Sequence, residues 1–211
     1  FWVRSKEIGL RSRLQLAIGR FKGLTISTTV LSICLVMAVG GFILYNNHVL
    51  NHNDSLAEQT HKSVEYEKRF IGFEHLPQPT IVGTKLHVDI FPKQNKATIS
   101  GTYHMVNNTA LPIDSILLSS VGGVSTEGIV FDRQAKLLTA GDNNIDKVYV
   151  LLKALQRGDS MRINFKVNYE PKGFTNNGVE SHVLANGTYF TNRHLLPVIG
   201  FQPYRCVSDV S

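Results

Sequence analysis

The sequence has few cysteines, and their positions rule out a disulfide framework. Only Cys34 and Cys206 occur among 211 residues, and Cys34 lies inside a long apolar run. A thiol within a membrane-length segment cannot pair with one near the end of a soluble domain of the same subunit. A small secreted scaffold held together by disulfides is therefore excluded.

The sequence also lacks the short motifs of common catalytic and metal centres. It contains no H-E-x-x-H zinc motif, no G-x-S-x-G nucleophile elbow and no glycine-rich phosphate loop. Eight histidines are spread along the chain: His48, His52, His61, His75, His87, His104, His182 and His194. His87 and His104 are the pair that neighbouring strands could bring face to face. Zinc needs three or four ligands, so two solvent-facing strand histidines are the expected arrangement.

Residues for nucleophilic or acid–base chemistry are equally sparse. Ser181 and His182 are adjacent, with Asp209 as an available acid, but neighbouring residues in a strand point to opposite faces. The remaining candidates are carboxylates beside predicted turns, namely Asp142, Asp146 and Glu170. We therefore predict no catalytic, cofactor-binding or metal-binding residue in this sequence. Asn53, Asn107 and Asn186 each begin an N-x-S/T pattern, which is frequent by chance and matters only in a eukaryotic secretory protein.

The positive charge of the chain is concentrated at its amino end. The net charge is +6, and residues 1–23 hold six basic residues against one acidic residue, Glu7. The remaining residues are nearly neutral, with sixteen basic and fifteen acidic side chains. A nucleic-acid partner is disfavoured because the larger part of the chain has no basic stripe.

A charge-free apolar run from Leu24 to Tyr45 predicts a transmembrane helix over residues 24–45. At about 1.5 Å per residue, such a helix spans roughly 33 Å and crosses a hydrocarbon core of about 30 Å. A signal peptide is the alternative interpretation. The run exceeds the usual apolar region of roughly 7 to 15 residues and no A-x-A-like cleavage site follows it, so we predict an uncleaved span.

The basic flank predicts the orientation of this span. Lys and Arg beside a transmembrane helix remain on the cytoplasmic side and contact anionic lipid. Residues 1–23 are therefore expected to be a cytoplasmic juxtamembrane segment, and residues 46–211 to be extracytoplasmic. The lipid bilayer is the first predicted partner.

Residues 46–76 are predicted to form a helical stalk or linker. Ser55 and Glu58 have the spacing of a capping box, and a polar segment follows them to about Phe73. Leu76-Pro77-Gln78-Pro79 ends the helix, since each proline disfavours helix at the residue before it. The soluble domain is therefore expected to cover residues 77–211.

An alternating pattern of polar and apolar residues predicts strands throughout residues 77–211. The segment 85–90 alternates cleanly, a turn at 92–95 follows it, and 97–106 returns as a second strand. The clearest alternation runs from Met161 to Tyr169, where every odd position is apolar. Further short strands are predicted at 113–121, 129–131, 136–138 and 148–152, with Asn-Gly turns later in the chain. Strands without intervening helices predict a mainly β fold, an antiparallel β-sandwich preceded by one transmembrane helix and the stalk.

The order of these features resembles a known bacterial arrangement. The stalk sequence Tyr66-Glu67-Lys68-Arg69-Phe70 and the Val88-Asp89-Ile90 strand look like membrane proteins that join an ABC-type permease to an aminopeptidase N-like domain. The stretches 186–190 and 196–202, with Arg205, resemble the close of the amino-terminal β domain in that zinc metallopeptidase family.

The resemblance implies that this chain is a fragment of a longer protein of the inner (plasma) membrane. It would comprise the last transmembrane helix and a saddle-shaped, non-catalytic, periplasmic β domain that packs on a catalytic domain beyond Ser211. Zinc, the peptidase chemistry and a peptide substrate would then belong to the parent protein, and no cofactor would bind in this fragment. The alternative hypothesis is a single-pass, membrane-anchored β-sandwich binding module without enzymatic activity.

Overall fold

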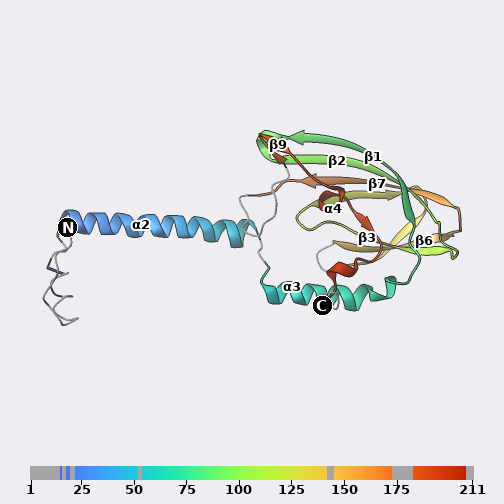
Figure 1. The fold of residues 1–211 in the computed structure, drawn as a ribbon, viewed down its shortest axis with the longest axis horizontal. Helices are drawn as coiled ribbons and strands as arrows, with labels where there is room; N and C mark the ends of the chain where they lie inside the picture. The colour runs from blue at the N-terminus through green and yellow to red at the C-terminus, as the bar shows by residue number, and fades with distance from the viewer. Residues whose placement is uncertain are drawn as a thin grey trace. The chain divides into compact units, whose positions relative to one another are not determined.

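The computed structural model describes residues 15, 18–19, 22–51, 54–141, 145–172 and 183–207. These residues fall into two compact units. The first contains the apolar helix and the second contains the β domain, and each is described separately below (Figure 1).

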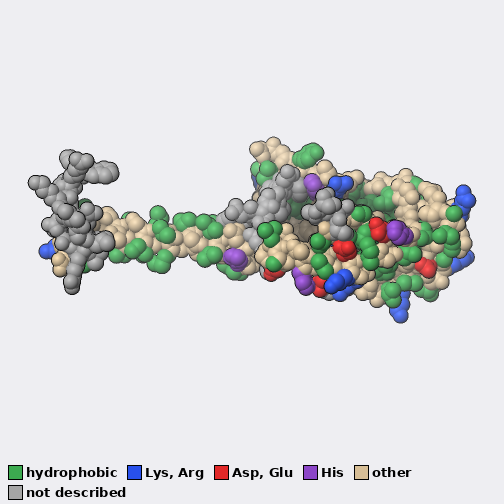
Figure 2. Space-filling view, turned by 60° about the horizontal axis from the view of Figure 1, so that its bottom comes forward, with side chains coloured by type: hydrophobic (Ala, Val, Ile, Leu, Met, Phe, Trp, Pro, Cys, Tyr) green, Lys and Arg blue, Asp and Glu red, His purple; other side chains and the backbone are tan. Residues whose placement is uncertain are grey.

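The apolar segment forms helix α2 (Leu24–Leu44), which continues as the π-helix η1 (Tyr45–Leu50). Together they make one helix of 27 residues that is long and apolar enough to cross a membrane. The hydroxyls of Ser27, Thr29 and Ser32 donate to carbonyls three or four residues earlier, so they carry no unsatisfied donor. Figure 2 shows hydrophobic side chains along the visible face of this helix.

Helix α3 (Leu56–Phe70) opens with the predicted capping box. The hydroxyl of Ser55 accepts from the Glu58 N–H, and the Glu58 carboxylate accepts from the Ser55 N–H at 2.6 Å. Lys62 extends this end of the helix by pairing with Asp54 at 2.6 Å. The 3₁₀ turn η2 (Ile71–Phe73) follows, and the prolines after it lead into the first strand.

The predicted antiparallel β-sandwich is present as two four-stranded sheets. The first sheet has the order β1-β2-β7-β4, with β1 (Thr80–Phe91), β2 (Lys96–Val106), β7 (Ser160–Tyr169) and β4 (Ser125–Phe131). The second has the order β10-β3-β6-β5, with β10 (Val198–Ile199), β3 (Ile113–Ser119), β6 (Asp146–Leu155) and β5 (Ala135–Ala140). The smaller elements are η3 (Pro92–Gln94), β8 (Val183–Leu184), β9 (Gly187–Thr188), α4 (Asn192–Leu195) and η4 (Pro203–Arg205).

The predicted hairpin and the strongly alternating strand are confirmed. The turn between β1 and β2 closes on Asn95, whose φ of 51° lies in the left-handed region that asparagine tolerates better than most residues. Along β7 the five odd positions are buried, while Arg162, Asn164 and Lys166 face outward. A one-residue slip would expose all five, so the pattern fixes the register.

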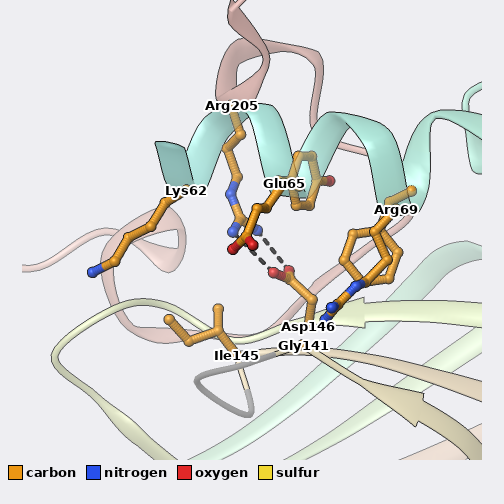
Figure 3. A pocket seen from close by; sticks show the side chains of 9 residues that line it. Lys62, Glu65, Arg69, Gly141, Ile145, Asp146 and Arg205 are labelled. Carbon is orange, nitrogen blue, oxygen red and sulfur yellow. Dashed lines mark hydrogen bonds and ion pairs between the residues drawn. The ribbon is translucent and has the colours of Figure 1, made fainter. Parts of the chain in front are cut away.

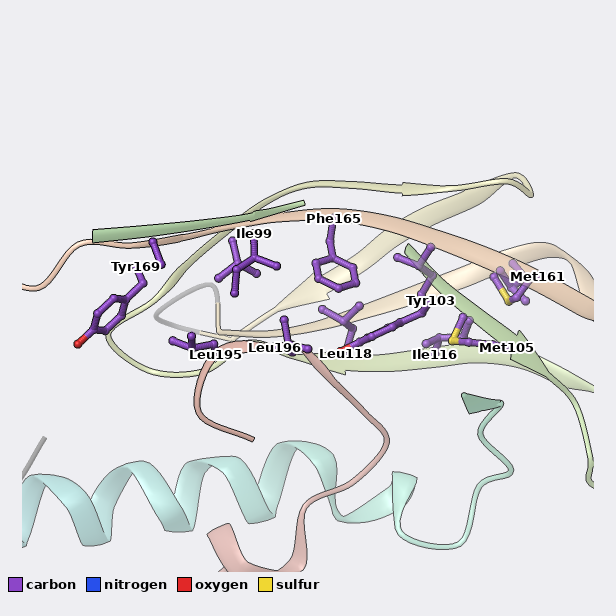
Figure 4. Close-up of a cluster of buried hydrophobic side chains, with 14 of the residues drawn as sticks. Ile99, Tyr103, Met105, Ile116, Leu118, Met161, Phe165, Tyr169, Leu195 and Leu196 are labelled. Carbon is purple, nitrogen blue, oxygen red and sulfur yellow. The ribbon is translucent and has the colours of Figure 1, made fainter. Parts of the chain in front are cut away.

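The main core lies between the two sheets (Figure 4). Ile99 and Phe165 from the first sheet and Ile116 and Leu118 from the second are each at most 3% exposed. Gly101 of β2 leaves room for the Phe165 ring, because a Cβ at this position would overlap the ring. This close approach explains why a glycine stands in the middle of a long strand.

A second apolar cluster lies on the outer face of the second sheet. Leu117 and Val148 face away from the main core and contact Tyr66 and Phe70 of α3, together with Cys206. The second sheet is thus covered on both faces, which explains the uninterrupted buried run Ile116-Leu117-Leu118. The domain has three layers, two sheets and one helix.

This third layer differs from the expected stalk. We predicted that residues 46–76 would stand apart and that the soluble domain would begin at residue 77, but α3 belongs to the same compact unit as the strands. The aromatic residues at positions 66 and 70 are one helical turn apart and almost completely buried. A thin apolar face suffices for docking because its residues are large aromatics.

Candidate functional site

A largely buried polar arrangement joins α3 to the last described residues (Figure 3). Arg205, in η4, donates from both terminal nitrogens to the two carboxylate oxygens of Asp146, at 2.6 and 2.9 Å. The Asp146 side chain is 8% exposed, so the ion pair is largely removed from solvent. A paired fork of this kind fixes the orientation of both groups.

Tyr66 of α3 completes the arrangement. The guanidinium of Arg205 lies 4.0 Å from the centre of the Tyr66 ring, within the range of a cation–π contact. The Tyr66 hydroxyl accepts from the Gln202 N–H at 2.9 Å, and its ring stacks on Phe201 at 5.5 Å. We call Tyr66, Asp146 and Arg205 the clamp.

The surroundings of the clamp shift the ionisation of its members. Burial raises the pKa of the Tyr66 hydroxyl to about 12, although the Gln202 N–H and the charge of Arg205 act in the opposite direction. Burial alone would lower the pKa of Arg205, but its hydrogen bonds to Asp146 and the charge of that carboxylate raise the pKa above its ordinary value. Both groups therefore keep their protons at neutral pH.

Further hydrogen bonds tie the last described residues, and Gln78 before β1, to the second sheet and to α3. The Val207 N–H donates to the Glu67 carboxylate at 3.1 Å. The Gln78 side chain donates to the Ser115 carbonyl and accepts from the Leu117 N–H, while the Gly200 N–H donates to the Leu117 carbonyl. The stretch that follows β10 thus holds α3 against the sheet.

The chemistry of the clamp is that of a structural contact. The adjoining cavity has a volume of about 90 Å³, which admits only a few water molecules. Its lining offers Glu65, Lys62 and Arg69 besides the clamp, without a serine, cysteine or histidine nucleophile. Tyr66 is committed to an N–H donor and Asp146 to a guanidinium, so neither is poised for proton transfer.

The structure separates the two strand histidines, His87 and His104. His87 lies opposite Ser100 and His104 opposite Gly83, so the two do not face each other. At roughly 3.3 Å per residue, their positions are about 13 Å apart along the sheet. His87 instead lies 3.4 Å from the Asp89 carboxylate. His52 and His182 lie outside the described residues.

The described residues do not fit a zinc site. Within them, no group of three or more His, Cys, Asp or Glu side chains comes together. Of the other candidates, Asp146 belongs to the clamp, and Glu170 pairs with Lys96 at 3.0 Å. Ser181, Asp142 and Asp209 lie outside the described part of the chain.

Of the three N-x-S/T patterns, the one at Asn107 cannot be a glycosylation acceptor in the folded domain. Its side chain is fully buried and its amide donates to the carbonyls of Leu111 and Leu155, each at 2.8 Å. Asn186 is exposed in the turn between β8 and β9, and Asn53 lies outside the described residues.

Among the comparisons with known proteins, only the one with solved structures gives matches. No family model matches the chain, and no curated protein does. The solved structures include an M1 zinc metallopeptidase from Deinococcus radiodurans, at 13% identity and a TM-score of 0.36. A mutant of that enzyme bound to a Tyr-Ser-Ala substrate matches at 16% identity and a TM-score of 0.34. In both cases the match covers 45% of this chain and 21% of the other, so this chain spans about a fifth of the length of the proteins it matches.

The clamp was not predicted from the sequence as a site. In the sequence, Arg205 was noted only as part of the resemblance to the aminopeptidase N family. Asp146 was noted only as a carboxylate beside a predicted turn. The contact joins residues 59 positions apart, and no local periodicity encodes such a pair. The aromatic spacing of Tyr66 and Phe70 was the available signal, because two large rings one helical turn apart indicate a buried face.

Proposed function

We propose that this chain is the membrane-anchored, non-catalytic β domain of an aminopeptidase-like zinc metallopeptidase. In this proposal, the domain packs on a catalytic domain beyond Ser211 and helps to wall the cleft in which peptides bind. The zinc and the catalytic residues belong to that following domain. These 211 residues contribute support and anchorage.

The observation that carries the proposal is the role of the stretch 196–205 in the fold. This stretch resembles the close of the amino-terminal β domain in the aminopeptidase N family. In the structure it adds β10 to the edge of β3 and then supplies Arg205 to the clamp. The residues that carry the resemblance thus complete the second sheet and hold α3 on it, as residues that close a domain should.

The anchor of this domain is the helix Leu24–Leu50. We propose that it spans the inner membrane with the basic residues 1–23 in the cytoplasm and residues 46–211 in the periplasm, because Lys and Arg flanks resist translocation. The basic flank lies almost entirely outside the described residues. We further propose that the parent protein is a fusion with an ABC-type permease, for which this helix is the last span.

The orientation is testable with a single exposed cysteine. Cys206 is only 5% exposed and is a poor reporter, whereas Tyr189 is 73% exposed. Tyr189→Cys in a background without Cys34 and Cys206 should react with an impermeant maleimide added to the periplasmic side of intact spheroplasts. Labelling that requires disruption of the membrane would contradict the proposed orientation.

The peptidase assignment is testable on the full-length protein. Purified protein should hydrolyse aminoacyl-4-nitroanilides, lose this activity to a chelator and regain it with zinc, whereas residues 1–211 alone should be inactive. Reading the coding sequence beyond Ser211 provides a second test, because the proposal requires a thermolysin-like H-E-x-x-H domain there. A stop codon directly after Ser211 would eliminate the proposal.

The alternative function, a membrane-anchored binding module without enzymatic activity, is favoured by one observation. β1 and β10 are the free edges of the two sheets on the same side of the sandwich, and between them lies a groove of about 370 Å³. Ile81 and Tyr103 line one wall and Leu196 and Ile199 the other. An extended peptide could pair with such an edge. Capture of a peptide by a chain that has no downstream domain would favour this alternative.

A further inference from the structure

A second cavity lies on the outer face of the second sheet, and it shares Arg193 and Val198 with the groove at the β1 edge. Its volume is about 330 Å³, within the usual range of small-ligand pockets. Ser119 and Val198, which pair across β3 and β10, line the cavity, and Asp146, the partner of Ser119 on β6, lies outside the lining. These three side chains share the face on which Leu117 and Val148 contact α3. Gln202, Tyr204 and Arg205 form another wall.

The charges around this cavity are of one sign. Arg193 and Arg205 line it, and no acidic side chain does so among the described residues. The charge of Arg205 is already matched by Asp146, which lies beneath and whose two oxygens both accept from that guanidinium. Arg193, on α4, is exposed and has no hydrogen bond or ion pair with any described residue. The cavity thus offers one unmatched guanidinium.

The wall of the cavity also contains hydroxyl groups without partners. Ser119 is only 3% exposed, and its Oγ has no hydrogen-bond partner among the described residues. The same holds for the Oγ of Ser120, the next residue along the chain. Buried hydroxyls are normally satisfied by protein, water or a ligand. Two of them in one wall, beside an unmatched cation, indicate a polar occupant.

We propose that this cavity binds a carboxylate. A guanidinium fork matches the two oxygens of a carboxylate, and a hydroxyl can donate to the same group directly or through one bridging water. The volume suits a group of the size of one or two residues, so the carboxylate is the carboxyl terminus of a peptide or an acidic side chain. Arg193 is the specificity-determining residue, because it is the unmatched charge. This site does not depend on the proposed peptidase function.

The test is calorimetric titration of the 211-residue chain, in a neutral detergent and at low ionic strength. The probes are N-acetyl-Ala-Ala with a free carboxyl terminus, the same dipeptide as its amide, and N-acetyl-Glu amide. We expect a free carboxylate to bind and the dipeptide amide not to bind. Comparing the first probe with the third distinguishes a chain terminus from an acidic side chain.

Variants locate the binding. Arg193→Ala should weaken carboxylate binding by about tenfold or more, as loss of a charge-assisted pair does, and Arg193→Lys should weaken it less. Arg157→Ala removes another exposed positive charge, from the turn between β6 and β7, and should leave binding unchanged. Ser119→Ala should weaken binding by about twofold to tenfold, as loss of a neutral hydrogen bond does.

Three results would overturn the proposal. They are the absence of heat with both carboxylate probes, equal binding of the dipeptide acid and its amide, and equal effects of Arg193→Ala and Arg157→Ala. The last result would show a diffuse charge effect in place of a site. Arg193 is exposed, so the thermal unfolding of Arg193→Ala should match that of the parent chain. This match separates lost binding from lost folding.

Discussion

Arg205 rests on the ring of Tyr66, with 4.0 Å between the guanidinium carbon and the ring centre, while both of its terminal nitrogens bind Asp146. One side chain therefore connects the third layer, the second sheet and the last described turn of the chain. The contact joins the helix that follows the apolar helix α2 and η1 in the sequence to the residues that lead toward Ser211. The stability of the three-layered domain should depend on it.

Arg205→Ala should lower the free energy of unfolding by about 2 to 3 kcal/mol. The substitution leaves the nearly buried Asp146 carboxylate without its partner and removes the cation–π contact, although the partial exposure of Arg205 moderates the cost. Urea unfolding of the detergent-solubilised chain, followed by circular dichroism, measures the change. Arg205→Lys should recover only part of the loss, because an ammonium cannot form the fork.

The matched control is Arg133→Ala. Arg133 also pairs with an aspartate, Asp159 at 3.4 Å, but the two side chains are 29% and 37% exposed. Such an exposed pair contributes about 1 kcal/mol or less. If the two alanine variants lose equal stability, the clamp has no special role.

Alkaline pH should destabilise the β domain. Burial raises the pKa of both Tyr66 and Tyr103 to about 12, against 10.0 for the unburied group. A folded-state pKa above the unfolded one stabilises the protein fully below pH 10, and this contribution disappears as the pH rises through 12. Between these values the unfolded chain releases protons that the folded chain retains.

Urea unfolding between pH 9 and pH 12 measures this effect. Tyr103→Phe, which removes a hydroxyl that donates to the Pro197 carbonyl, should reduce the loss of stability per pH unit. Tyr189→Phe, at an exposed tyrosine, is the control and should leave the slope unchanged. A pH dependence identical in all three proteins would contradict the assignment to buried tyrosines.

Asn107→Ala should cost about 2 to 4 kcal/mol of unfolding free energy. The substitution leaves the buried Leu155 carbonyl without its side-chain donor and removes one of two donors to the Leu111 carbonyl, which also accepts from the Thr109 hydroxyl. It also removes the amide oxygen that accepts from the Thr109 N–H and hydroxyl. Asn107→Asp should be at least as damaging, since a carboxylate cannot donate to a carbonyl. Thermal unfolding reports the change, and a loss below about 0.5 kcal/mol would contradict the fully bonded position of Asn107.

Ser119→Ala should leave the stability of the ligand-free domain unchanged or raise it by up to about 1 kcal/mol. The Ser119 hydroxyl is buried without a partner among the described residues, and removing an unsatisfied polar group relieves its desolvation cost. Denaturant unfolding without added carboxylate is the measurement. A loss above about 1 kcal/mol would show that the hydroxyl is bonded in the ligand-free protein.

The strands were largely predictable because their patterns are local. Alternation from Met161 to Tyr169 reports a single buried face, and a charge-free run reports an apolar helix, whatever the rest of the chain does. The capping box at Ser55 and Glu58 is equally local. Each of these patterns involves only residues that are close together in the sequence.

The third layer and the clamp were not predictable in this way. Whether Tyr66 and Phe70 face water or a sheet depends on Leu117 and Val148, which lie far away in the sequence. The strands that carry Leu117 and Val148 also contribute to the main core on the opposite face of the sheet. The pairing of Asp146 with Arg205 depends on how the chain returns after β10. A stalk and a docked helix differ only in these long-range contacts.

Zinc content is the most direct test of the central claim, that the chain is the non-catalytic β domain of a zinc metallopeptidase whose metal lies beyond Ser211. Elemental analysis by mass spectrometry should be performed on the full-length protein and on residues 1–211, each dialysed against trace zinc. The proposal predicts stoichiometric zinc in the full-length protein and none in residues 1–211. Stoichiometric zinc in residues 1–211, or none in the full-length protein, would contradict it.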